Sequence, residues 1–250
     1  MQLLHANIKN ELQKLFLKKK TIAFFIIAAI IPIVSIILVL AFRNGLGIIS
    51  ANTTSFPLFV LGIFTNVFLP LFAAMVAIDL FSGEVGDKNL KITLLRPISR
   101  FKIYTSKILS VGIYICINLG LVFVISVILG FFLSGKDALL PGLLKDVLAY
   151  LVAVVPMLSI VIAVAFISQF FKSSSGALTV CILVFICAKV VPIFSQPVSR
   201  ILITSYTDWH LMWIGSFLSY AKIFNVFMLF LSYSLIFFAA GFYIFDKKEL

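Results

Sequence analysis

Two charged residues of this chain, Asp79 and Lys189, lie in or at the end of long apolar runs. An ionisable side chain at membrane depth is by default a functional candidate. Lys189 is only a few residues from the end of its run, so its ammonium can extend to the outer headgroups, and we favour that interpretation over a position in a pathway. Asp79 ends its run at the inner boundary, where it is either a simple interfacial acid or a partner of Arg96 or Arg100.

Motifs that carry catalysis or metal binding do not emerge from the sequence. It contains no HExxH, GxSxG or inward-facing pair of carboxylates. The stretch GFFLSGKD at 130–137 approaches the phosphate-binding pattern GxxxxGK[ST], but Asp137 stands where a hydroxyl should meet magnesium, and its carboxylate would repel phosphate. Cysteine and histidine also lack the spacing of ligands, at Cys116, Cys181, Cys187, His5 and His210. We therefore predict no catalytic, cofactor-binding or metal-binding residue.

The densest polar segment is DLFSGEVGDKNLKITLLRPISRFKIYTSK, at 79–107. Ser82-Gly83 can end the preceding helix, and 89–95 mixes leucine and isoleucine with lysine, as in a short amphipathic helix. Arg96-Pro97 then forces an extended or turn conformation. A short exposed helix with apolar side chains suits insertion into a groove on a partner protein. The alternative is that it rests on the inner leaflet.

Composition identifies the surroundings of these elements. Hydrophobic residues make up 62% of the 250 residues and charged residues 12%, and a soluble domain of this length cannot bury that much apolar surface. About 20 apolar residues cross a bilayer core of ~30 Å. We therefore predict an all-α membrane protein with a single transmembrane domain over 1–250 and six spans, at 21–42, 56–80, 108–133, 147–171, 177–194 and 223–245.

Lysine and arginine set the orientation of the spans. With the N-terminus inside, the inner segments hold Lys9, Lys14, Lys18, Lys19, Lys20, Lys88, Lys91, Arg96, Arg100, Lys102, Lys107, Lys172, Lys247 and Lys248, and the outer ones only Arg43, Lys136, Lys145, Arg200 and Lys222. This asymmetry predicts that both termini are cytoplasmic. It also accounts for the net charge of +11 without nucleic acid as a partner, since such residues anchor a protein to the membrane.

Two further elements border the spans. Residues 1–20 place apolar side chains at helical spacing, which predicts an amphipathic helix in the membrane surface. Residues 196–222 form the longest outer loop, where we expect a short helix at the outer leaflet. Its aromatic residues are typical of a membrane–water interface: Tyr206, Trp209, Trp213 and Tyr220.

With these features in place, the polar segment resembles the cytoplasmic loop of permease subunits of type-2 ABC exporters, the ABC-2 family. That family shows an acid, an aromatic and SGE, then a Leu-rich stretch ending in P-[IV]-S-R, with an aromatic and a lysine after it. The spacer Lys88-Asn89-Leu90 departs from the family's Gly-Thr-Leu, so only Leu90 matches there. The other matching residues are Asp79, Phe81, Ser82, Gly83, Glu84, Leu94, Leu95, Arg96, Pro97, Ile98, Ser99, Arg100, Tyr104 and Lys107.

The resemblance implies a permease without a catalytic site of its own. Such a subunit pairs with a second copy or a paralogue, and each binds a cytoplasmic P-loop ATPase that holds ATP and magnesium. Relatives in bacterial cell membranes export peptides, antibiotics or lipids, and some confer resistance to antimicrobial peptides, so we expect an amphipathic substrate. Within the coupling loop, 81–107, contact with the ATPase would fall to Glu84, Leu90, Leu94, Leu95, Arg96, Pro97 and Arg100.

Other functions stay open. A transporter driven by an ion gradient usually carries acids and broken helices at the midplane, and no acid lies centrally in these spans. A membrane-embedded enzyme would need clustered histidine or acids at the membrane face. A sensor or immunity protein that transports nothing could share the same six spans.

Overall fold

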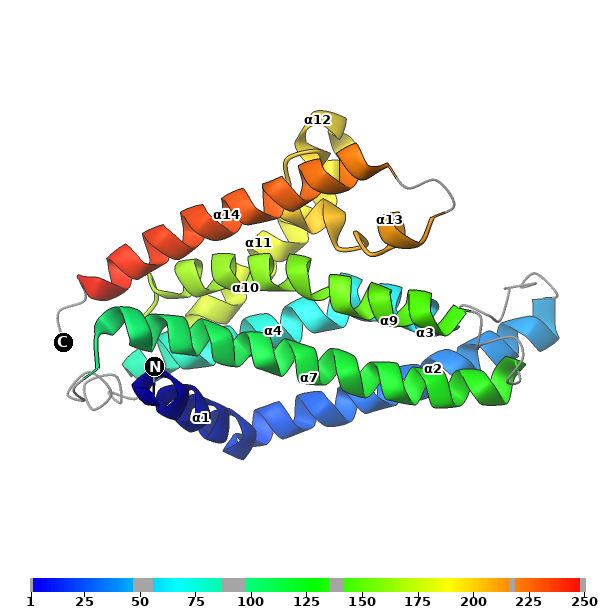
Figure 1. The fold of residues 1–250 in the computed structure, drawn as a ribbon, viewed down its shortest axis with the longest axis horizontal. Helices are drawn as coiled ribbons and strands as arrows, with labels where there is room; N and C mark the ends of the chain where they lie inside the picture. The colour runs from blue at the N-terminus through cyan, green and yellow to red at the C-terminus, as the bar shows by residue number, and fades with distance from the viewer. Residues whose placement is uncertain (1, 47–55, 87–97, 135–141, 216–218, 248–250) are drawn as a thin grey trace.

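The computed structural model describes residues 2–46, 56–86, 98–134, 142–215 and 219–247. Almost all of these are helical, and none of them lies in a strand. Long apolar runs become helices because lipid offers no partner to a free backbone N–H or C=O. The elements that build the bundle are α1 (Gln2–Leu17), α2 (Lys19–Leu46), α3 (Phe56–Ile63), α4 (Leu69–Ile78), α5 (Glu84–Gly86), α7 (Arg100–Ser134), α9 (Leu143–Val152), α10 (Val154–Ser168), α11 (Ser174–Phe194) and α14 (Tyr220–Asp246) (Figure 1).

Six helices within the described residues are long and apolar enough to cross a membrane, as the sequence predicts. The second combines α3, α4 and α5 with two π-helical segments, η2 (Phe64–Phe68) and η3 (Asp79–Gly83), and the fourth combines α9 and α10. α10 packs between α4 and α14, while α7 packs against α1, α2 and α3. The start of α1 and the end of α14 lie at the same end of the bundle (Figure 1).

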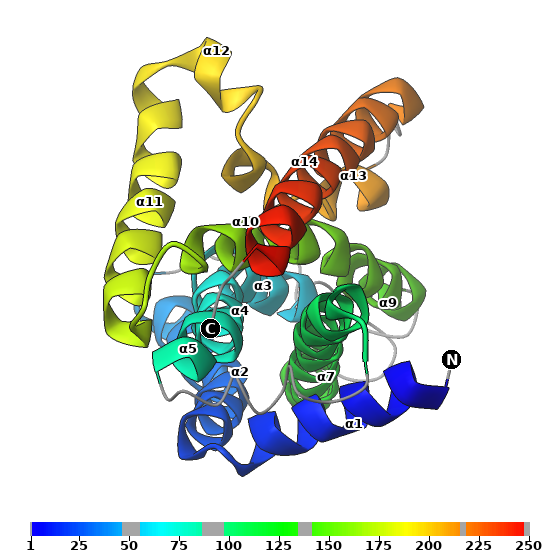
Figure 2. The same cartoon turned by 90° about the vertical axis from the view of Figure 1, so that its left-hand side faces the viewer.

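α1 confirms the predicted N-terminal helix. It lies across the bundle beside α7, whereas α7 is seen nearly end-on in the same view (Figure 2). The helix ends at Leu17, and α2 begins at Lys19, so the chain turns between them. The crosswise position fits a helix in the membrane surface, although that location stays a prediction.

The predicted break at Ser82-Gly83 is wrong. The second span continues through η3 and α5 as far as Gly86. The Ser82 hydroxyl donates a hydrogen bond to the backbone carbonyl oxygen of Ser168 at the end of α10. A π-helical turn accommodates the serine and glycine without ending the helix.

The third span also starts earlier than predicted, at Arg100 rather than 108. Ile103 and Tyr104 are buried, and the Tyr104 ring packs edge-on against Phe238 of α14, 5.1 Å between ring centroids. The coupling loop predicted over 81–107 is thus helical over 81–86 and 100–107. Of its intervening part, 87–97 lies outside the described residues.

The aromatic loop at 196–222, predicted to lie outside, contains several short helices, α12 (Gln196–Ser199), the 3₁₀ helix η5 (Ile203–Tyr206) and α13 (Leu211–Ile214). Trp209 corrects the expectation of an interfacial aromatic, because it is buried within the protein and packs on Trp213, Phe227 and Phe230. Tyr220 is exposed, as expected of an interfacial residue.

Candidate functional site

Four charged side chains from three elements meet near the end of the bundle that holds the termini. We name them the Lys107 cluster: Glu11 and Lys14 of α1, Glu84 of α5 and Lys107 of α7. The Lys107 ammonium lies 2.6 Å from Glu84 Oε2 and 3.1 Å from Glu11 Oε2, and it also donates to the carbonyl oxygen of Leu80 at 3.1 Å. The side chains of Lys107 and Glu11 are fully buried.

Lys14 closes the cluster from its more exposed side. Its ammonium lies 3.0 Å from Glu11 Oε1 and 3.1 Å from Glu84 Oε1. Two ammonium groups therefore balance two carboxylates. Removal of ions from water is compensated only where geometry and hydrogen bonds are good, and this arrangement gives every carboxylate oxygen an ammonium partner.

The protonation of the α1 residues follows from these contacts. Burial acts to raise the pKa of Glu11, but the ammonium groups of Lys107 and Lys14 outweigh it, and the pKa falls below its ordinary value. Burial acts in the opposite direction on Lys14, and the carboxylates of Glu84 and Glu11 outweigh it, so the pKa of Lys14 is raised. Both groups are thus held in their charged forms.

The cluster fastens α1 to the helices that flank 87–97. Glu84 belongs to α5, just before that segment, and Lys107 lies in the first turns of α7 after it. Asn7 adds a further link, because its side-chain amide donates to the Ser106 hydroxyl at 2.6 Å. A displacement of α5 or α7 would therefore also displace α1.

The structure brings some of the predicted coupling residues together. Glu84 is in the Lys107 cluster, and Arg100 donates to the carbonyl oxygen of Asp246 at the end of α14. Asp79 contacts Lys18 and Lys20, at 3.9 and 3.8 Å. Its predicted pairing with Arg96 or Arg100 stays a prediction. The remaining predicted coupling residues lie outside the described residues: Leu90, Leu94, Leu95, Arg96 and Pro97.

A second polar group, the Lys189 cluster, consists of Asn66 of η2, Lys189 of α11, and Thr207 and Asp208 of the segment after α11. Lys189 Nζ donates to Asn66 Oδ1 and to Thr207 Oγ1, both at 2.8 Å. Asn66 Nδ2 donates to Asp208 Oδ1 at 2.6 Å. Lys189 is thus directed to polar groups of the protein, and its extension to the outer headgroups stays a prediction.

The Lys189 cluster borders a cavity of about 260 Å³. Hydroxyl groups of Ser199, Thr204 and Ser205 line it together with the cluster. This arrangement can bind a polar or charged group, which sets it apart from the closed Lys107 cluster. The cavity could hold a ligand of several heavy atoms.

His210 lies beside this region but is fully buried, and neither ring nitrogen has a hydrogen-bond partner among the described residues. Burial lowers its pKa, and the opposing effect of the Asp208 carboxylate does not compensate. Nowhere in the part of the chain that the structure describes do three His, Cys, Asp or Glu side chains gather as they would around a metal ion.

Sequence reasoning missed Glu11 as a partner of Lys107 and Asn66 as a partner of Lys189. It also missed Lys14 as a second cation beside Glu11 and Glu84. Glu11 carried a usable signal, since it is the only acid in 1–20. Asn66 carried another, because an amide inside an apolar span needs a hydrogen-bond partner.

Comparison with known protein families supports the resemblance to the ABC-2 family. No curated protein matches the chain. The family model described as "ABC-2 family transporter protein" matches residues 7–195, more than half of the chain, and this range contains both Lys107 and Lys189 with most of their partners. The chain belongs to the ABC-2 family of transporter proteins.

Proposed function

We propose that this permease exports an amphipathic substrate and is driven by a separate cytoplasmic P-loop ATPase, which holds ATP and magnesium and does the hydrolysis. The observation that carries the proposal is the Lys107 cluster. It joins α1, α5 and α7 at both ends of 87–97, within the coupling loop, 81–107, that is predicted to bind the ATPase.

In this proposal a force applied at 87–97 moves the attached helices together. Buried ion pairs with several hydrogen bonds resist separation, because breaking one leaves an uncompensated charge. α1 and the ends of the second and third spans would then respond as one rigid body when two ATPases close. A second permease copy or a paralogue would supply the other half of the pathway.

The proposed location is a bacterial cell membrane, with both termini cytoplasmic. Support comes from the excess of lysine and arginine in the segments that share a side with the termini. Export of antimicrobial peptides, antibiotics or lipids, and resistance to such compounds, belongs to this proposal through the family alone.

The test is purification of the tagged chain from its native membrane in mild detergent, with mass spectrometry of the proteins that co-purify. We expect a stoichiometric P-loop ATPase. Arg96→Glu, or deletion of 90–95, should abolish its association, whereas the matched change Arg200→Glu should not. Equal recovery of ATPase with all three variants would refute the coupling assignment.

Reproducible absence of any ATPase from an intact, folded chain would favour the ion-gradient transporter or the sensor instead. A proton- or sodium-dependent uptake assay in vesicles would then separate those two functions.

A further inference from the structure

An apolar cavity of about 170 Å³ lies between α10, α11, α14 and the residues just before and within η5. Ile160 and Ala163 of α10, Val184 of α11, and Tyr233 and Phe237 of α14 line it. Both α11 and α14 diverge from α10 in the end view (Figure 2). The lining is almost wholly aliphatic and aromatic, so the cavity suits a hydrocarbon chain.

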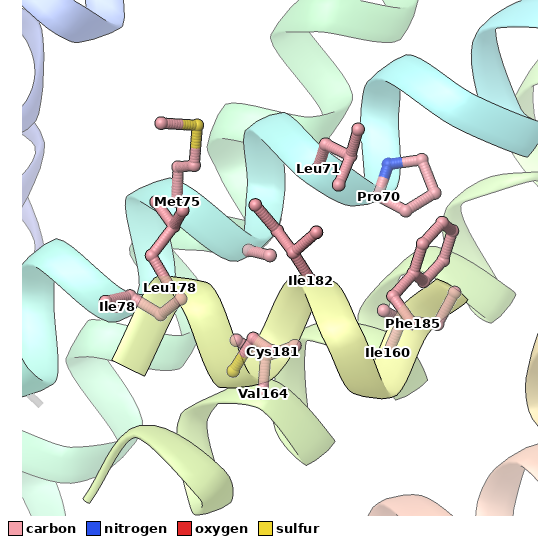
Figure 3. A pocket seen from close by; sticks show the side chains of 11 residues that line it. Pro70, Leu71, Met75, Ile78, Ile160, Val164, Leu178, Cys181, Ile182 and Phe185 are labelled. Carbon is pink, nitrogen blue, oxygen red and sulfur yellow. The ribbon is translucent and has the colours of Figure 1, made fainter. Parts of the chain in front are cut away.

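α10 and α11 pack tightly with α4 beside an adjacent face of α11. Figure 3 shows Leu178, Cys181, Ile182 and Phe185 of α11 directed toward α4 and α10 around a void of only about 20 Å³. Cys181 and Phe185 line both spaces. The wider cavity is therefore a property of one face of α11 and not of loose packing around the whole helix.

The apolar cavity and the polar cavity beside the Lys189 cluster are neighbours. Ala188 and Thr204 line both of them. These two residues are joined by a hydrogen bond from Thr204 Oγ1 to the carbonyl oxygen of Ala188, at 2.8 Å. A single elongated ligand could place an apolar part on one side of this contact and a polar part on the other.

The polar cavity offers groups of both charges. An ammonium has three donors, and Lys189 uses two of them within the protein, on Asn66 and Thr207. Oδ1 of Asp208 accepts from Asn66, whereas its Oδ2 accepts no hydrogen bond from the described residues. The Ser205 hydroxyl is buried and also lacks a partner among them.

We propose that the two cavities form one binding site for a single-chain amphiphile whose polar end carries an anionic group and an amine. The anion would accept from Lys189 and Ser205, the amine would donate to Asp208, and the alkyl chain would lie between α10, α11 and α14. This inference rests on the proposed function only in treating the bound amphiphile as the exported substrate.

The chain in nanodiscs, titrated with three single-chain probes of equal alkyl length, tests the site. The probes are lysophosphatidylethanolamine, with both charges, lysophosphatidic acid, with the anion alone, and a primary alkylammonium, with the cation alone. We expect the first to bind roughly tenfold more tightly than the others, since each charged hydrogen bond contributes about that factor. Equal affinities would overturn the proposal.

Variants locate the site. Lys189→Met should weaken binding of the first probe roughly tenfold, and Ala163→Phe should abolish it by filling the apolar cavity. The matched controls are Lys222→Met and Ala239→Phe, exposed positions of α14 that line neither cavity. The two variants change different parts of the site, because Ala163→Phe leaves the Lys189 cluster intact. If one of them fails to fold, the other still tests the site. Variants that bind the probe as tightly as their controls would overturn the site. An Ala163→Phe variant that folds and binds the probe unchanged would also overturn it.

A bound lipid of the bilayer and an exported substrate share this chemistry. Vesicles that contain the chain with its co-purified ATPase separate the two, because only a substrate moves across the membrane when ATP is added. If the probe binds but is not transported in the presence of the ATPase and ATP, the substrate assignment is overturned. The proposed function as an ABC exporter is not affected by that result. Binding in a chain that never associates with an ATPase would refute the proposed function and support the site.

Discussion

The Lys107 and Lys189 clusters are both built around one lysine, yet they differ in how fully that lysine is enclosed. Lys107 is fully buried and has two carboxylates and a carbonyl oxygen around its three donors. Lys189 is half-buried and contacts an amide and a hydroxyl group, beside a polar cavity of about 260 Å³.

This difference indicates two roles for a charge in a membrane protein. A buried lysine with all three donors engaged, as Lys107 is, has none left for a ligand, so it serves to hold helices together. A lysine with a donor in reserve and space beside it can bind something. Burial alone would point to Lys107 as the functional lysine, whereas the unused hydrogen-bonding capacity points to Lys189.

Lys107→Met gives the largest expected effect. It leaves the carboxylates of Glu11 and Glu84 with Lys14 as their one remaining cation in the cluster, and removal of one partner from a buried pair costs about 3–5 kcal/mol. Lys189→Met removes hydrogen bonds to neutral groups, so its cost should be smaller, about 1–3 kcal/mol. Thermal unfolding of the purified chain in detergent measures both.

The control for Lys107→Met is Lys102→Met, an exposed position on the same helix. It should unfold like the unchanged protein. If Lys189→Met were the more destabilising of the two lysine changes, the roles assigned to the two clusters would have to be exchanged.

The six spans could be predicted from the sequence because apolar length alone determines them. Their ends could not, since they depend on contacts made in three dimensions. The run of apolar residues indicates a start of the third span at 108, but the helix extends back to Arg100. It does so because Tyr104 packs on α14 and Lys107 pairs with α1 and α5.

The sites divide in the same way. The family resemblance singled out Glu84, and its place in an apolar run singled out Lys189; both belong to the clusters described above. The partners of the two central lysines lie far along the chain: Glu11 is a partner of Lys107, and Asn66 is a partner of Lys189. No local sequence pattern connects the members of either pair. The contact between Lys189 and Asn66 could not be predicted, because the general behaviour of lysine near a span end takes no account of an amide on a neighbouring helix.

Acidification should affect the two regions in different pH ranges. Burial lowers the pKa of His210, near the Lys189 cluster, below its ordinary 6.5. The unfolded chain then takes up a proton that the folded chain does not, so stability falls as the pH drops below 6.5 toward the folded-state pKa. His210→Gln should flatten this decline, whereas the exposed His5→Gln should not.

Glu11, in the Lys107 cluster, responds at lower pH. Its pKa is lowered below the ordinary 4.5, so its stabilisation is complete above 4.5 and is lost as the pH falls through the folded-state pKa. Glu11→Gln should cost about 1.5–3 kcal/mol at neutral pH, and this difference should shrink in acid. Unfolding curves that start at pH 7 and extend well below pH 4 test both residues. A decline of the unchanged protein confined to below 4.5 would contradict the assignment to His210.

Asp79→Asn gives the smallest expected effect and marks the edge of the Lys107 cluster. Its carboxylate lies 3.8 and 3.9 Å from Lys20 and Lys18, and all three side chains are partly exposed. Exposed pairs at such distances contribute about 0–1 kcal/mol. Screening should reduce even this, so high salt should remove the difference between Asp79→Asn and the unchanged protein but should leave the cost of Lys107→Met intact. A loss above about 2 kcal/mol that persists in high salt would place Asp79 in the closed ion network, which would then extend from α5 to the start of α2.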